Sequence, residues 1–219
     1  MTSSESINLR DCKIAFFSPI VSDRDVLDLG VVQHDIDNFD DSNWLHRAIV
    51  SAARSCTGLD IDELGVEELR KRGFNVVCAN AEAFELKEQF DVVVAGDIIE
   101  HLGNIGGFLD CVRKHMKPGG LFALSTPNPF WWKHGAQVVL KGRAVVHPQH
   151  TGWLCPQTLT QVLSRHGFSV TRMEFGSVYR LTTVLQRVTW LIDRLLPMPR
   201  RISCNTILCV ARDARHAES

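Results

Sequence analysis

The amino-acid sequence predicts an α/β protein built on a doubly wound, mainly parallel sheet, and three features support this fold class. Short apolar runs alternate with segments of helical periodicity along the 219 residues, as in strand–helix–strand units. The apolar runs hold Val, Leu and Ile without polar alternation, which favours strands buried on both faces. Hydrophobic residues make up 45% of the chain, enough for a substantial core.

Seven strands are predicted from the apolar runs, at residues 25–29, 56–59, 75–78, 90–95, 121–125, 168–175 and 206–212. Apolar residues at helical spacing, together with caps and terminating glycines, predict helices at about residues 44–53, 63–72, 105–116, 156–167 and 178–195. We therefore expect crossover helices that cover both faces of the sheet.

The chain is expected to form a single domain, residues 1–219, because no repeat, low-complexity tract or linker divides it. Within it, residues 1–24 are an N-terminal extension or helix. Residues 127–155 are rich in aromatics, histidine and turn formers, and we interpret them as a substrate-side loop. Residues 178–196 are interpreted as an amphipathic helix inserted before the last strand.

The amino-acid composition indicates what kind of partner the protein binds and in which cellular compartment it lies. The formal net charge is −1, with both signs interspersed, so nucleic acid is not an expected partner and a small molecule is favoured. Seven scattered cysteines without a Cys-x-x-Cys pair argue against a disulfide framework or a zinc knuckle. No secretory signal or spanning apolar run is present. These features predict a cytoplasmic, soluble protein.

Short motifs lie at and after the predicted strands: VLDLG (26–30), GLDID (58–62), NAEAF (80–84), FDVVVAGDIIEHL (90–102), MKPGGLFALSTPNP (116–129), HTGW (150–153) and LSRHGF (163–168). In their order and spacing they resemble the class I S-adenosylmethionine-dependent methyltransferases, over about residues 25–175. The resemblance implies a Rossmann-like fold whose last strand is antiparallel, and S-adenosylmethionine as cofactor. It also implies methyl transfer to a small molecule, with an oxygen as the favoured acceptor atom.

The cofactor residues are expected where the strands of a parallel sheet end, because ligands bind beyond those ends. Asp60 ends the second strand, where a carboxylate suits the two hydroxyls of a ribose. Its alternative role is to cap the next helix, although Asp62 is better placed for that. For Asn80 the alternative is a turn. The full set of cofactor contacts that the resemblance implies is Asp28, Gly30, Asp60, Ile61, Asn80, Ala81 and Asp97.

The segment after the fourth strand holds three side chains that could carry chemistry. If this segment turns into a helix, Asp97, Glu100 and His101 share one face. They resemble the Glu-x-x-Glu-His pattern of ubiquinone-biosynthesis O-methyltransferases and small-RNA terminal methyltransferases, and His150 matches the later histidine of that pattern. A divalent ion held by these four residues would orient substrate hydroxyls.

Catalysis without a metal is the favoured alternative, because similar Glu-His pairs occur in this fold without an ion and Asp97 is shorter than the usual Glu. His101 or His150 would then act as general base, since a histidine pKa of about 6.5 lets it accept a proton near neutral pH. Glu100 would orient the two histidines.

The loop after the first strand departs from the family pattern. Further glycines are usual there, but residues 31–35 read VVQHD, whose side chains could crowd the cofactor. A binding or regulatory module that has lost cofactor affinity is therefore an alternative. A nicotinamide-dependent oxidoreductase is less favoured, because it would need Gly-x-Gly-x-x-Gly and this loop offers Gly30 alone.

The apolar stripe of residues 178–195 is expected to pack on the protein, the commonest arrangement of an amphipathic helix. A peripheral membrane contact is an alternative, helped by Arg200 and Arg201. A substrate lid and a dimer face are further alternatives, and the sequence leaves the oligomeric state open.

Overall fold

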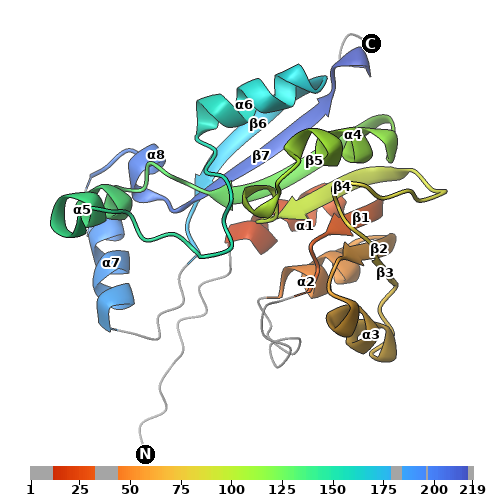
Figure 1. Ribbon diagram of the computed structural model, residues 1–219, viewed down its shortest axis with the longest axis horizontal. Coiled ribbons are helices and arrows are strands. Elements are labelled where there is room, and N and C mark those ends of the chain that lie inside the picture. Colours follow the sequence, from red (N-terminus) through yellow and green to blue (C-terminus); the bar gives the residue numbers. More distant parts are fainter. Residues whose placement is uncertain (1–11, 33–43, 179–183, 196, 217–219) are drawn as a thin grey trace, which may run out of the picture.

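A seven-stranded sheet forms the centre of the protein in the computed structural model, which describes residues 12–32, 44–178, 184–195 and 197–216 (Figure 1). Along the sheet the strands lie in the order β3-β2-β1-β4-β5-β7-β6. Their bounds are β1 Asp25–Leu29, β2 Ser55–Asp60, β3 Val76–Cys78, β4 Phe90–Gly96, β5 Met116–Pro127, β6 Phe168–Gly176 and β7 Thr206–Asp213. Strands β1 to β5 are parallel, and β7 runs antiparallel to both β5 and β6. The predicted fold class and the antiparallel last strand are confirmed.

Helices cover both faces of this sheet. On one face, α4 and α6 contribute Phe108, Leu109 and Leu163 to the largest buried cluster, while on the other face α1 and α2 contribute Phe17 and Ile49 to a second cluster. The helices are α1 Cys12–Val21, α2 Leu45–Ala52, α3 Glu63–Lys71, α4 Ile105–Lys114, α5 Trp132–Lys141, α6 Pro156–Arg165, α7 Val184–Leu195 and α8 Arg200–Ser203. Two short 3-10 helices span Ile99–His101 and Ala214–His216.

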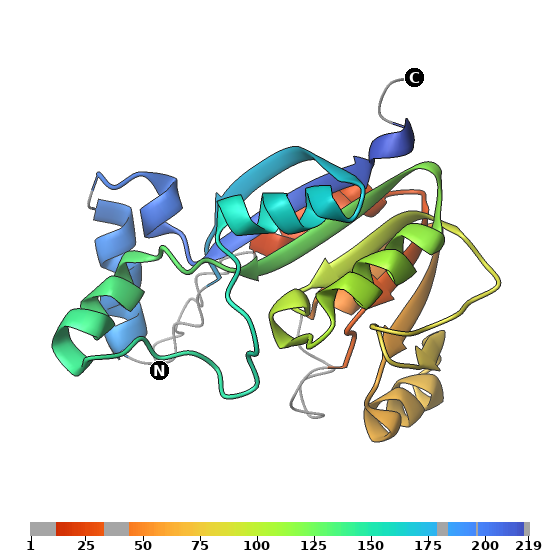
Figure 2. The same cartoon turned by 45° about the horizontal axis from the view of Figure 1, so that its top comes forward.

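Helices α5, α7 and α8 do not lie on either face of the sheet. They gather beyond one end of it, as both views of the ribbon show (Figures 1 and 2). The indole Nε1 of Trp132 on α5 donates to the Asp193 carboxylate on α7. Nδ2 of Asn128, in the segment between β5 and α5, donates to the carbonyl oxygen of Arg201 on α8 at 2.8 Å. No helix among the described residues has the length and hydropathy needed to cross a bilayer.

Two sequence predictions differ from the structure, and a third is covered by it only in part. The helix expected to reach Met116 ends at Lys114, because Met116 already pairs with Phe90 of β4 and begins strand β5. The segment 127–155, predicted as a loop, contains α5, which ends where Gly142 adopts a φ of 70° that is strained for other residues. The helix expected over 178–196 is described only from Val184 to Leu195, and residues 179–183 and 196 lie outside the described part.

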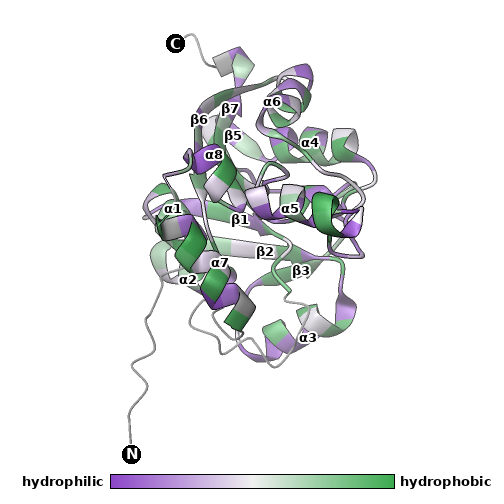
Figure 3. Ribbon diagram, turned by 90° about the vertical axis from the view of Figure 1, so that its left-hand side faces the viewer, coloured by the Kyte–Doolittle hydropathy of each residue, from purple (hydrophilic) through white to green (hydrophobic). Residues whose placement is uncertain are grey.

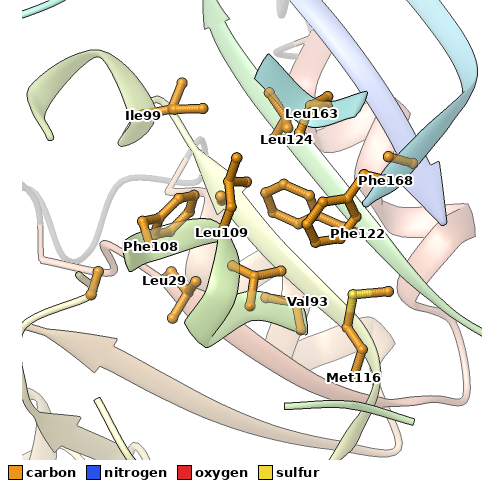
Figure 4. Close-up of a cluster of buried hydrophobic side chains, with 14 of the residues drawn as sticks. Leu29, Val93, Ile99, Phe108, Leu109, Met116, Phe122, Leu124, Leu163 and Phe168 are labelled. Carbon is orange, nitrogen blue, oxygen red and sulfur yellow. The ribbon is translucent and has the colours of Figure 1, made fainter. Parts of the chain in front are cut away.

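The core between the sheet and α4 is built around packed aromatic rings (Figure 4). Phe108 is fully buried and its ring lies 6.1 Å from the ring of Phe122 on β5, in an edge-to-face arrangement. Phe122 in turn contacts Phe168 of β6, with 5.4 Å between ring centroids. These aromatic contacts connect α4 to β5 and β6.

Removal of the Phe108 ring should destabilise the fold measurably. Phe108→Ala should lower the free energy of unfolding by about 3 to 5 kcal/mol, the cost of losing a buried aromatic ring and leaving a cavity. Leu64→Ala, on the exposed side of α3 where Leu64 is 72% exposed, should change it by less than about 0.5 kcal/mol. Urea denaturation followed by circular dichroism measures both, and equal losses would contradict this account of the core.

Candidate functional site

A cavity of about 440 Å³ opens at the carboxyl ends of β1, β2, β3 and β4. This is the edge of a parallel sheet at which ligands bind, next to the point where the strand order reverses between β1 and β4. Six residues predicted as cofactor contacts lie on its wall: Gly30, Asp60, Ile61, Asn80, Ala81 and Asp97. The other lining residues are Val32, Leu59, Ala79, Glu82, Ile98, His101, Leu102 and Gly103.

The Asp60 carboxylate is fixed in the cavity by backbone donors. Its Oδ2 accepts a hydrogen bond from the Val32 amide at 2.8 Å, and its Oδ1 accepts one from the Asp62 amide at 3.1 Å. The capping role that the sequence left open belongs to Asp62, which accepts from the Leu64 and Gly65 amides at the start of α3. Each oxygen of a carboxylate accepts more than one hydrogen bond, so Asp60 has capacity for a further donor.

The chain turns tightly at Gly30, which has a φ of 78° and whose amide donates to the Leu59 carbonyl at 2.8 Å. A Cβ here would lie 3.1 Å from the Cδ1 of Ile98, so a side chain would be both strained and crowded. The next residue, Val31, is 3% exposed and packs in a buried cluster with Trp44 and Val66.

The divergent loop therefore does not fill the cavity with its first side chain. Val31 points into the core, and its carbonyl accepts a hydrogen bond from Trp44 Nε1 at 3.1 Å, while Val32 forms part of the cavity wall. Residues 33–35 of the VVQHD segment lie outside the described residues.

Asp28 differs from its predicted place, because it lies in the interior and is not part of the cavity wall. Its carboxylate is 3% exposed and forms a hydrogen bond with Nδ1 of His46 at 2.8 Å. Burial raises the pKa of Asp28, and the contact with His46 opposes this shift. His46, on α2, was not found from the sequence. The pair supports the sheet behind the cavity.

The far end of the cavity has an apolar and partly exposed wall. Ile61 is 67% exposed and Ala81 is 6% exposed. The Oδ1 of Asn80 accepts from the Glu82 amide at 2.9 Å, so the turn that the sequence left as an alternative is present. Because an amide oxygen has two lone pairs, this turn is compatible with a second contact in the cavity.

Asp97 and Glu100 do not share a helical face, which corrects the predicted arrangement. Asp97 has a φ of 53° and lies before the 3-10 helix Ile99–His101. Its Oδ1 accepts from the Ser125 hydroxyl at 2.6 Å, and its Oδ2 pairs with the ammonium group of Lys13 on α1. Burial acts to raise the pKa of Asp97, but Lys13 and Ser125 outweigh it, and the pKa lies below its usual range.

Glu100 is 1% exposed, and its Oε2 accepts a hydrogen bond from the Thr126 hydroxyl at 3.0 Å. Burial, assisted by the negative charge of Asp97, raises its pKa to about 8, against the opposing hydrogen bond of Thr126. Ser125 and Thr126 are consecutive residues of β5, so their side chains point to opposite faces of the strand. This alternation holds Asp97 and Glu100 apart.

Two distant parts of the chain bring His101 and His150 together. The amides of Thr151 and Gly152 donate to the main-chain carbonyl of Glu100 at 2.8 and 3.1 Å. The rings of His101 and His150 consequently lie 4.7 Å apart, centroid to centroid, in an edge-to-face arrangement. His101 also lines the cavity, so one member of the pair borders the space in which a ligand would bind.

The ligand-type atoms of Glu100, His101 and His150 lie within 4.8 Å of one another, a donor set that a divalent ion could use. The fourth predicted ligand, Asp97, is not part of this group, because it pairs with Lys13. The four-residue metal site that the sequence left as an alternative is therefore not assembled in this structure.

The pKa of Glu100 gives a testable pH dependence. The pKa of the Glu100 carboxyl is raised from 4.5 to about 8 in the folded protein. Between these two pH values the folded protein therefore keeps the proton, whereas the unfolded chain loses it. The stability that this contributes is complete below about pH 4.5 and is lost as the pH rises to about 8, in total on the order of a few kcal/mol.

Glu100→Gln should flatten the pH dependence of the free energy of unfolding across this window, while the exposed control Glu88→Gln should leave it unchanged. Urea denaturation at a series of pH values measures it. A wild-type protein that gains stability between pH 5 and pH 8 relative to Glu100→Gln would contradict the assignment.

Comparison with known sequences matches a family model described as "Methyltransferase domain" to residues 10–172. Three relatives are similar over part of the chain. A ubiquinone biosynthesis O-methyltransferase of Nitrobacter winogradskyi is 31% identical over 47% of this chain and 41% of its own length. A probable S-adenosylmethionine-dependent methyltransferase of Mycolicibacterium smegmatis is 34% identical over 56% of this chain and 46% of its own. The human mitochondrial ubiquinone biosynthesis O-methyltransferase is 32% identical over 43% of this chain and 27% of its own.

The chain thus spans less than half the length of these curated relatives.

Solved structures are similar over nearly the whole chain. An S-adenosylmethionine-dependent methyltransferase from Archaeoglobus fulgidus has a TM-score of 0.62 at 20% identity, covering 91% of this chain and 92% of that one. The glycopeptide N-methyltransferase MtfA in complex with S-adenosylmethionine has a TM-score of 0.61 at 19% identity, covering 92% and 86%. At these identities, the likeness concerns the fold.

Proposed function

Because the chain belongs to the class I S-adenosylmethionine-dependent methyltransferase family, we propose that it transfers a methyl group from that cofactor to a small molecule, at an oxygen atom. The observation that carries the proposal is the position of His101, which lines the cavity and contacts the ring of His150. A proton acceptor therefore borders the cofactor cavity.

The seven cysteines are all free thiols, which supports a reducing, cytoplasmic setting.

The cavity fits the nucleoside part of the cofactor. The Asp60 carboxylate, held by the Val32 and Asp62 amides, is oriented to accept hydrogen bonds from a vicinal diol. Ile61 and Ala81 offer apolar surface for an adenine ring. A volume of about 440 Å³ lies within the range of small-molecule sites.

The other end of the cavity suits positive charge. Asp97 lies on the wall and keeps its negative charge, because Lys13 and Ser125 hold its pKa below the usual range. S-adenosylmethionine supplies, when bound, an ammonium group and a methyl group on positively charged sulfur. We assign Asp97 to the binding of this charged end.

The histidine pair would remove the proton from an acceptor hydroxyl. A neutral imidazole nitrogen of His101 or His150 accepts it, since the ordinary pKa of histidine is about 6.5. Glu100 acts as a positioning residue: its main-chain carbonyl holds the segment that carries His150, and Thr126 fixes its carboxyl group. Orientation and exclusion of water supply the rest of the rate enhancement.

Oxygen is the proposed acceptor atom for two reasons. The matched relatives of Nitrobacter winogradskyi and of human mitochondria are named O-methyltransferases. In addition, a hydroxyl must lose its proton as it is methylated, whereas a neutral amine attacks through a free lone pair. A positioned general base therefore accelerates methylation of oxygen more than methylation of nitrogen.

The ribose assignment predicts a binding defect. Asp60→Ala should weaken the binding of S-adenosylhomocysteine by about 1.5 to 3 kcal/mol, the range for hydrogen bonds to a charged group. Asp62→Ala is the matched control: it removes the cap of α3 and should cost about 1 kcal/mol of stability, with little effect on affinity. Isothermal titration calorimetry measures the affinities. Unchanged binding by Asp60→Ala would disprove the assignment.

The catalytic assignment predicts a defect in turnover. His101→Ala should reduce methyl transfer from labelled S-adenosylmethionine to a panel of phenols and catechols by about a hundredfold to ten-thousandfold, as expected for the loss of a general base. Affinity for S-adenosylhomocysteine should change much less. His166→Ala, whose ring lies beside Asp110 on α4 and not on the cavity, should behave as wild type.

Two results would contradict this assignment. Equal losses of turnover and cofactor affinity in His101→Ala would give His101 a purely structural role. Failure of the wild-type protein to bind S-adenosylhomocysteine at all would instead favour the non-catalytic binding module.

A further inference from the structure

The end of the molecule formed by α5, α7 and α8 exposes aliphatic side chains that have no counterpart to cover them among the described residues. Val139 and Leu140, consecutive residues of α5, are 85% and 81% exposed. On α7, Val188, Leu191 and Leu195 are 46%, 46% and 68% exposed and share one helical face. We name these five residues the end surface. Figure 3 looks onto it and shows hydrophobic bands on both helices.

The charge around the end surface is strongly one-sided. Residues 128–155 contain three basic side chains and no acidic one, and residues 184–203 contain four basic and one acidic. The acidic one, Asp193, accepts the indole N–H of Trp132. The whole chain carries a net charge of −1, so the basic excess at this end is offset by an acidic excess elsewhere.

We propose that the end surface docks on the surface of an anionic lipid bilayer. Exposed aliphatic side chains beside Lys and Arg are the combination that binds such a surface, because the apolar groups enter the headgroup boundary while the cations contact anionic lipids. Lys141 and Arg143 follow the exposed aliphatics of α5 directly, and Arg200 and Arg201 begin α8; all four are exposed.

An exposed tryptophan, Trp153, lies beside α5, and tryptophans are enriched at membrane interfaces. Trp131 and Trp132 begin α5, with the ammonium of Lys133 5.1 Å from the ring centroid of Trp131. Trp153, 37% exposed, lies with its ring 4.8 Å from that of His134 on α5. An amphipathic indole suits a position between water and acyl chains.

Charge favours a lipid surface over a second copy of this chain. A symmetric dimer formed through the end surface would bring the basic groups of the two copies together, and like charges across an interface are unfavourable. Anionic lipid headgroups complement the same groups.

One segment of the chain connects α5 with the catalytic pair. The segment that follows α5 carries His150, whose ring contacts His101, and then Trp153, whose ring contacts α5 through His134. Docking through the end surface would therefore bring the segment that carries His150 toward the bilayer, and we assign the acceptor to an apolar molecule taken from it. This last step rests on the proposed methyl transfer, whereas lipid binding does not.

Cosedimentation of the full chain with vesicles tests the proposal. The protein should bind vesicles of phosphatidylcholine mixed with phosphatidylglycerol, bind pure phosphatidylcholine much less, and lose binding as salt is added. The double variant Val139→Asp, Leu140→Asp should bind the anionic vesicles about tenfold or more weakly. Arg200→Gln with Arg201→Gln should weaken binding and reduce its dependence on salt.

Leu64→Asp is the matched control, because Leu64 is comparably exposed, at 72%, but lies on α3 away from the end surface. It should bind vesicles as wild type does. All variants should retain the wild-type melting temperature and affinity for S-adenosylhomocysteine, so loss of lipid binding is distinguished from unfolding and from failure of the cofactor assignment.

Three results would overturn the proposal. The first is binding that does not distinguish anionic from neutral vesicles. The second is equal binding by wild type and the Val139→Asp, Leu140→Asp variant. The third is a dimer in light scattering that this double variant dissociates, in a protein that does not bind vesicles.

Discussion

The hydrogen bonds from the Thr151 and Gly152 amides to the Glu100 carbonyl are the contacts on which the proposed catalytic arrangement depends. They join segments 51 residues apart, and the Thr151 hydroxyl reinforces them with bonds to the carbonyls of Glu100 and Leu102, the second at 2.8 Å. Without them His150 would have no fixed relation to His101. Because the bonds use backbone groups, the geometry depends on the path of the chain more than on side-chain identity.

Two neighbouring carboxyl groups, Asp97 and Glu100, have their pKa values shifted in opposite directions by their surroundings. Lys13 and Ser125 keep Asp97 charged on the cavity wall, while burial and the charge of Asp97 keep Glu100 protonated up to a pH of about 8. Carboxyl pairs separated in this way commonly carry different roles in one site. In the proposed function, Asp97 contacts the cationic end of the cofactor beside its partner Lys13, and Glu100, hydrogen-bonded to Thr126, positions the histidine pair.

The strands were predictable because buried parallel strands leave a strong local signal, and the strand ends then place Asp60, Asn80 and His101 at one edge without further information. The positions predicted for Asp28 in the cavity and for Asp97 on one face with Glu100 were wrong, because they depend on contacts with residues distant in the sequence. Asp28 is drawn into the interior by His46, and Asp97 is turned away from Glu100 by Lys13 and by consecutive hydroxyls of β5. Helix α5 was not predicted, because its aromatic residues and its glycine led us to interpret the segment as a loop.

The central claim is that His101, brought against His150 by the Glu100 carbonyl, borders the cofactor cavity. Nitrogen NMR of the imidazole rings during titration with S-adenosylhomocysteine tests it directly. The ring signals of His101, on the cavity wall, should shift and saturate at the same ligand concentration as a smaller shift of His150, while those of His166 stay constant. Saturating binding that leaves the signals of both His101 and His150 unmoved would contradict the account.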